Sequence, residues 1–227
     1  MDCKKALEES GGDFDKAIEV LRKKGQKVAA NRADRESSEG VVLAKVNSDN
    51  TSGIIISLNC ETDFVAKNDD YVQLAQRLSD HALGFDDKES FLDSDFEGMK
   101  VSEKLLEQTG IIGEKIEIGS FEHVSANFVG SYIHAGNKIA SIVGFSENFD
   151  NASEVGKDLS MQIAAMNPVA IDENGVSQEI IAKEIEIAKD QLRQEGKPEE
   201  MLDNIAKGKL KKFFKENTLI NQQFIKD

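Results

Sequence analysis

The 227-residue chain is 39% hydrophobic and 31% charged, which indicates a globular protein with a real core, and no apolar run reaches the ~20 residues of a membrane-spanning helix. Lysine and arginine total 28 against 42 aspartate and glutamate, and this formal net charge of −14 excludes bulk attraction to nucleic acids or anionic membranes. The only cysteines are Cys3 and Cys60 and no secretory leader is visible, which favours a reducing cytoplasm.

Residues 1–25 predict a small helical module. A short helix ends at a Gly-Gly pair, Asp13 is the expected cap of a second helix, and Gly25 is expected to end it. Residues on one face of this second helix are apolar: Phe14, Ala17, Ile18 and Leu21. Residues 26–39 are polar and charged and are interpreted as a linker, partly helical.

Residues 40–125 predict a first core subdomain that opens with two strands and a helix. The strands are expected over residues 41–46 and 54–58, with a turn rich in Asn, Asp, Ser and Gly at 47–53. A helix follows a cap at Asp69-Asp70. Its apolar stripe is Tyr71, Leu74, Ala75, Leu78 and Ala82.

The corner between this strand and helix carries a carboxylate beside a large aromatic ring. It comprises Thr62, Asp63, Phe64 and Val65. Spacing alone leaves two interpretations open. Either Asp63 caps the helix and Phe64 packs inward, which is the commoner arrangement, or a rigid corner turns Phe64 outward as an anchor for another protein.

Two further elements complete the first subdomain. Ser102 is expected to cap a short helix, and residues 114–124 alternate like a strand. Between them, the Gly-punctuated segment 109–114 is interpreted as a plain turn. It lacks the glycine spacing of a phosphate loop, and Ile116 stands where that loop needs Ser or Thr, so no nucleotide site is expected.

Residues 130–168 repeat the strand–strand–helix plan. Strands are expected over 131–134 and 138–145, and the helix after them ends at Asn167-Pro168. Its apolar stripe is Val155, Leu159, Ile163 and Met166. Two copies of one ββα unit predict an α+β fold with two related subdomains, residues 40–125 and 126–227, and helices on one face of antiparallel hairpins.

An antiparallel helical hairpin is expected at about residues 177–216 of the second subdomain. The positions Ile181, Ile185, Ala188 and Leu192 follow a heptad seam. Glu195-Gly196-Lys197-Pro198 makes the turn, and the return arm continues the seam at Leu202, Ile205, Lys209 and Phe213.

A resemblance chooses between the two interpretations of the corner. The run Asn-Cys-Glu-Thr-Asp-Phe-Val-Ala-Lys at residues 59–67 resembles the signature of the elongation factor Ts family, guanine-nucleotide exchange factors of bacterial-type translation. The resemblance implies that the turn at Thr62, Asp63, Phe64 and Val65 inserts between helices of the GTPase domain of elongation factor Tu. The insertion would displace the partner's Mg²⁺ and so loosen GDP.

The same resemblance implies other partner contacts. Residues 1–7 are similar to the end of the family's ubiquitin-associated-like N-terminal domain, which implies contacts at Met1 and Lys4. Segment 109–114 resembles a second contact turn, which implicates Ile112 and Gly113. His134, in a Gly-Ser-Tyr-x-His segment, would face the third domain of elongation factor Tu. Ile225, where the chain resembles the family's return into the core, completes the set.

Compared with the family pattern, the chain is expected to lack both ends. Family members carry a further helix before this start, and a last strand and C-terminal helix after this end. The resemblance otherwise covers nearly the whole chain.

Signs of catalytic chemistry are absent from the sequence. The three histidines, His81, His123 and His134, include no pair at metal-ligand spacing, and Cys60 is expected to be buried and inert. We therefore expect a binding module with no catalytic residue, metal or cofactor. An enzyme of thiol or carboxylate type, and a chaperone-like or ubiquitin-like-binding protein acting through residues 1–25, are the alternatives. The oligomeric state is left open, a homodimer included.

Overall fold

The computed structural model describes residues 2–226. Chain contacts divide the molecule into two compact units, Met1–Ser160 (unit 1) and Met161–Asp227 (unit 2). Helices and antiparallel strands both contribute, so the fold has the mixed α+β character that the sequence predicts. None of the helices within the described residues has the length and apolar character to cross a bilayer.

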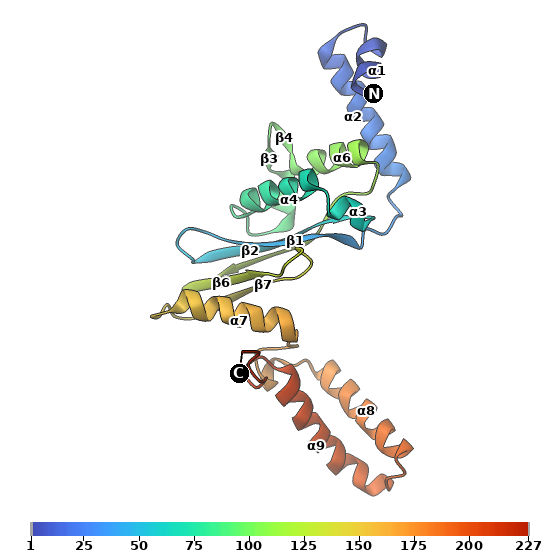
Figure 1. The fold of residues 1–227 in the computed structure, drawn as a ribbon. Coiled ribbons are helices and arrows are strands. Elements are labelled where there is room, and N and C mark those ends of the chain that lie inside the picture. Colours follow the sequence, from blue (N-terminus) through green and yellow to red (C-terminus); the bar gives the residue numbers. More distant parts are fainter. Residues whose placement is uncertain (1, 227) are drawn as a thin grey trace. The chain divides into compact units, whose positions relative to one another are not determined.

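Unit 1 carries all the named strands of the described chain (Figure 1). Its elements are α1 (Asp2–Glu9), α2 (Phe14–Asn31), β1 (Glu39–Val46), β2 (Ser52–Cys60), α3 (Asp63–Ala66), α4 (Asp69–Ala82), α5 (Lys88–Asp93), β3 (Asp95–Phe96), β4 (Met99–Lys100), α6 (Val101–Ile112), β5 (Glu117–Ser125), β6 (Phe128–Ile133) and β7 (Ala140–Phe145). α7 (Ala152–Met166) begins in unit 1.

The second helix, α2, is longer than predicted. Asp13 caps it by accepting a hydrogen bond from the backbone N–H of Lys16 at 3.1 Å. The prediction that Gly25 ends the helix is wrong, because α2 continues to Asn31 and Gly25 lies buried against α6. A glycine inside a helix permits a close backbone approach, and here that use replaces its role as a stop signal.

A three-stranded antiparallel sheet of order β1-β2-β5 forms the centre of unit 1. Successive side chains of β2 alternate between its faces, and Ile54, Ile56 and Leu58 are each at most 1% exposed. They share one core with Leu78 of α4 and Leu105 of α6, and α4 covers this face of the sheet (Figure 1). Burial of each such side chain stabilises the fold by about 1.5–3 kcal/mol.

Two helix caps differ from the predictions. The predicted cap at Asp69-Asp70 is displaced by one residue, because Asn68 accepts hydrogen bonds from the backbone N–H groups of Asp70 and Tyr71. Ser102 does not cap α6, since that helix begins at Val101, two residues before the predicted start, with Lys100 at the cap position. The acidic residues at 69 and 70 instead lie in the first turn of α4, where the helix dipole favours negative charge.

A second hairpin, β6–β7, lies on the side of the sheet opposite α4 (Figure 1). Its backbone bonds directly to the first hairpin, where the N–H of Val42 donates to the carbonyl of Asn137 at 2.7 Å. The start of α7 packs on β6 at very short range, because a Cβ on Gly130 would lie 2.7 Å from the Cα of Gly156.

Unit 2 contains η1 (Glu173–Gly175) and the hairpin of α8 (Gln178–Gln194) and α9 (Glu199–Asn217). Leu192 of α8 and Leu202 and Ala206 of α9 are at most 2% exposed, and Lys189 pairs with Asp203 across the hairpin. The antiparallel pair is therefore present as predicted. The return arm differs from the prediction in one detail. Phe214 is buried, whereas Phe213, which was predicted to lie in the seam, is only half-buried.

Candidate protein-interaction site

The corner after β2 presents an aromatic ring to solvent. Thr62 is extended, with φ −126° and ψ 152°, and the four-residue helix α3 follows it. Within α3, Phe64 is 83% exposed whereas Ala66 is 4% exposed. Val65, half-buried, packs against the core of unit 1. The inward interpretation of Phe64 is therefore wrong, and the outward orientation is confirmed.

Asp63 is the first residue of α3 and does not cap it. Its carboxylate instead accepts a hydrogen bond from the Nζ of Lys67 at 2.6 Å, one helical turn further on. This hydrogen bond, together with the positive charge, lowers the pKa of Asp63 below its ordinary value. The corner therefore offers an ionised acid directly beside an exposed ring.

Buried groups fix the base of the corner. The hydroxyl of Tyr71 in α4 donates to the carbonyl oxygen of Leu58 at 2.8 Å, and both side chains are buried. Cys60 is fully buried, its Sγ donates to the carbonyl of Thr62 at 3.2 Å, and burial raises the pKa of its thiol. Cys60 is thus buried at the end of β2, as predicted.

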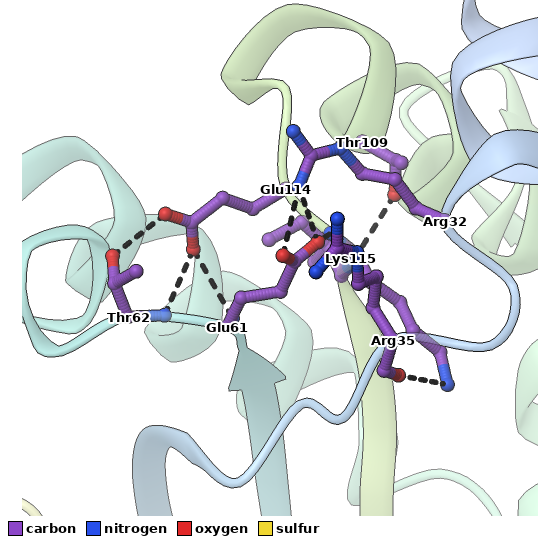
Figure 2. Close-up of polar contacts among 8 residues, drawn as sticks. Arg32, Arg35, Glu61, Thr62, Thr109, Glu114 and Lys115 are labelled. Carbon is purple, nitrogen blue, oxygen red and sulfur yellow. Dashed lines mark hydrogen bonds and ion pairs between the residues drawn. The ribbon is translucent and has the colours of Figure 1, made fainter.

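Two glutamates brace the corner from the side (Figure 2). The carboxylate of Glu114, which follows α6, accepts hydrogen bonds from the backbone N–H groups of Glu61 and Thr62 at 3.1 and 3.0 Å. It also accepts the hydroxyl hydrogen of Thr62 at 2.6 Å. In return, the carboxylate of Glu61 accepts the backbone N–H of Lys115 at 2.7 Å and the guanidinium of Arg32 at 2.8 Å.

Charge explains why two neighbouring acids are tolerated there. The hydrogen bond from the Lys115 backbone and the Arg32 guanidinium hold the pKa of Glu61 below its ordinary value.

Sequence reasoning missed Arg32, Glu61 and Glu114 as site residues. Glu114 stands 52 residues from Thr62 in the chain, and no local pattern marks such a pair.

The predicted second contact segment has a different shape from the predicted turn. Thr109 to Ile112 form the last turn of α6, and Gly113 ends the helix in the left-handed conformation with φ +81°. Ile112 packs partly against the core, whereas Ile111 is 70% exposed. Ile111, which sequence reasoning passed over, is therefore the apolar side chain that this segment presents outward.

The remaining predicted contact residues lie elsewhere on the described chain. Lys4 is exposed on α1 and pairs with Glu8 at 3.8 Å. His134 is exposed beyond the end of β6, with its Nδ1 3.0 Å from the hydroxyl of Tyr132. Ile225 belongs to unit 2, is 37% exposed and donates its backbone N–H to Gln162. Met1 lies outside the described residues.

Metal coordination finds no support in this part of the molecule. Within residues 2–226, no group of three or more His, Cys, Asp or Glu side chains is arranged to hold a metal ion. What the corner offers chemically is an apolar ring, an ionised carboxylate and a braced backbone, which suit contact with another macromolecule.

Comparison with known proteins gives a consistent result over the whole chain. Residues 61–227 match the family model described as elongation factor TS. The chain is 66% identical to elongation factor Ts of Christiangramia forsetii and 62% identical to that of Flavobacterium psychrophilum, in each case over all of this chain and 83% of the relative. It is 51% identical to elongation factor Ts of Amoebophilus asiaticus, over all of this chain and 83% of that relative.

Proposed function

Because the chain belongs to the elongation factor Ts family of translation elongation factors, we propose that it binds elongation factor Tu in the GDP-bound form and promotes GDP release. The observation that carries this proposal is the exposure of Phe64, 83%, on a corner whose other side chains are half-buried or buried. Phe64 is the most exposed large hydrophobic side chain among the described residues, and exposed aromatic rings of this kind serve as anchors in many protein interfaces.

The mechanism is an exchange of binding free energies and involves no chemistry on this chain. Filling an apolar slot between two partner helices with the Phe64 ring contributes about 1.5–3 kcal/mol. The displaced helices would disturb the ligands of the partner's Mg²⁺, and the partner would then bind GDP less tightly. By linkage, a factor that weakens GDP binding is itself bound less tightly when GDP is present.

Several other residues are proposed to contact elongation factor Tu. Lys4, Gly113, His134 and Ile225 are proposed contacts, and Ile111 joins or replaces Ile112 because it is the more exposed of the two. The net charge of −14 supports a protein partner over a nucleic acid. We place the protein in the cytoplasm, because translation takes place there and because both cysteines are free thiols, as a reducing compartment would keep them.

The finer architecture is part of the same proposal. Residues 1–25 form part of a ubiquitin-associated-like module. The segments β1–β2–α4 and β6–β7–α7 belong to two related subdomains, residues 40–125 and 126–227. The repeated order of hairpin and helix supports this relationship.

The test is release of a fluorescent GDP from elongation factor Tu. Phe64→Ala should slow release about tenfold or more, since 1.4 kcal/mol corresponds to one factor of ten. Phe149→Ala is the matched control, because Phe149 is also exposed, at 42%, but lies after β7 and not in the corner. An unchanged rate with Phe64→Ala, while the control behaves as the parent protein, would remove the proposed mechanism.

A further inference from the structure

The braced corner holds its shape through bonds that leave the local chain. Thr62 occupies the cap position of α3, yet its side chain makes no capping hydrogen bond to that helix. The hydroxyl points instead to Glu114, and both backbone N–H groups at the start of the corner point to the same carboxylate (Figure 2). A helix as short as α3 has little stability of its own, so an external acceptor decides how its first turn is held.

The two glutamates exchange bonds in both directions. The carboxylate of Glu114, in the chain after α6, accepts a hydrogen bond from the backbone N–H of Glu61, just before α3. The carboxylate of Glu61 in turn accepts a hydrogen bond from the backbone N–H of Lys115, the residue after Glu114. Arg32, just beyond α2, closes the arrangement by donating to both oxygens of Glu61 at 2.8 Å. Three segments that lie far apart in the sequence are thus joined by six hydrogen bonds among five residues.

We propose that Glu114 is a positioning residue for Phe64, and that the Glu61–Glu114 pair joins the corner to the exposed end of α6 as one preformed contact surface. The assignment rests on the exchange function proposed above. A preformed surface loses less conformational freedom on binding than a loose one, so the energy of ring insertion is available to displace the partner's helices. Glu114 touches neither nucleotide nor metal in this scheme and acts only through the ring.

The geometry identifies the variants that separate positioning from general stability. Glu114→Ala removes all three hydrogen bonds to residues 61 and 62. Glu114→Gln preserves them in number, because the amide oxygen can accept both backbone N–H groups and the amide N–H can donate to the Thr62 hydroxyl, which then accepts. Glu103→Ala is the charge control, since it removes an exposed carboxylate from α6 itself.

The experiment is a double-mutant cycle on GDP release from elongation factor Tu, measured over a range of exchange-factor concentrations. Glu114→Ala should lower kcat/KM about tenfold in the parent protein and less than about twofold in the Phe64→Ala background, because coupled residues are non-additive. Glu114→Gln and Glu103→Ala should stay within about twofold of the parent. Thr62→Val, which loses only the hydroxyl bond, should give an intermediate loss that also disappears without the ring.

Each outcome decides the matter. Equal losses from Glu114→Ala in both backgrounds, or a failure of Glu114→Gln to rescue, would overturn the positioning role and leave the exchange function standing. A normal rate with Phe64→Ala alone would overturn both. Should Glu114→Ala not fold, as judged by circular dichroism, Thr62→Val carries the same cycle. Faster amide hydrogen exchange at residues 61–66 in Glu114→Ala than in Glu114→Gln would support the brace independently of activity.

Discussion

Gly25 of α2 and Gly110 of α6 meet backbone to backbone: a Cβ on Gly110 would lie 2.6 Å from the Cα of Gly25. The contact sets how closely the two helices approach, and both α2 and α6 lead into the braced corner through Arg32 and Glu114. Helices cross this closely only where small residues face each other, so neither glycine is free to change.

Gly110→Ala should therefore destabilise unit 1. Overpacking a helix crossing costs about 1–3 kcal/mol, and the higher helix propensity of Ala, about 1 kcal/mol, offsets only a part. Gly208→Ala is the control, because Gly208 lies inside α9 with nothing within 4 Å of an added Cβ. Thermal unfolding should show a lower Tm for Gly110→Ala and an equal or higher Tm for Gly208→Ala. A Tm that rises in both would contradict the tight crossing.

Glu61 should make the protein sensitive to acid. Its pKa lies below the ordinary 4.5 because the Lys115 N–H and Arg32 stabilise the carboxylate, so the unfolded chain takes up a proton at a pH where the folded chain does not. The stability that Glu61 contributes is complete above about pH 5 and declines as the pH falls through the lowered pKa. Urea unfolding at a series of pH values should show a flatter acid limb for Glu61→Gln than for the parent. An acid limb as steep in Glu61→Gln as in the parent protein would contradict this role of Glu61.

The two cysteines should differ sharply in reactivity. Cys3 is exposed, whereas Cys60 is fully buried and burial raises the pKa of its thiol, so its reactive thiolate is scarce. A thiol reagent should label one cysteine in the native protein and two in denaturant, and Cys3→Ser should abolish the native labelling. Rapid native labelling of Cys60 would instead reopen the possibility of thiol chemistry.

The α8–α9 hairpin should depend on its two buried leucines. Leu192 and Leu202 are 2% and 1% exposed, and truncating such a residue to Ala costs about 2–5 kcal/mol. Met201, next to Leu202 in α9 but 50% exposed, provides the control. Helix content followed by circular dichroism on heating should fall at a lower temperature for Leu192→Ala and Leu202→Ala than for Met201→Ala. Equal melting of all three would show that the hairpin core contributes little.

Local patterns predicted most elements of the fold. The β-branched run at Ile54–Ile56 and the stripe from Tyr71 to Ala82 have the periods of a buried strand and a helix, and the structure has β2 and α4 there. The fate of Phe64 could not be predicted in this way, since an inward and an outward ring have the same spacing. Only the family resemblance favoured the outward orientation, and the contact with a partner remains a prediction.

Some predictions failed because they depend on contacts between distant segments. The local sequence at Gly25 resembles the C-terminal end of a helix. Its packing against Gly110 explains why α2 nevertheless continues past it. The brace at Glu114 was missed for the same reason, because its partner Thr62 lies far away in the chain. Charge, burial and hydrogen bonding between remote segments decide such positions, and a single sequence shows none of these directly.

The bond from Tyr71 to the carbonyl of Leu58 closes a short loop of chain at its neck. Because the neck is fixed by buried groups and the Phe64 ring is 83% exposed, the ring itself contributes little to holding the loop shut. Phe64 could then be exchanged for another large side chain without redesigning the scaffold, and such a library would present varied tips on one frame. The corner would in this sense be a site at which the proposed contact with elongation factor Tu can be varied by substitution.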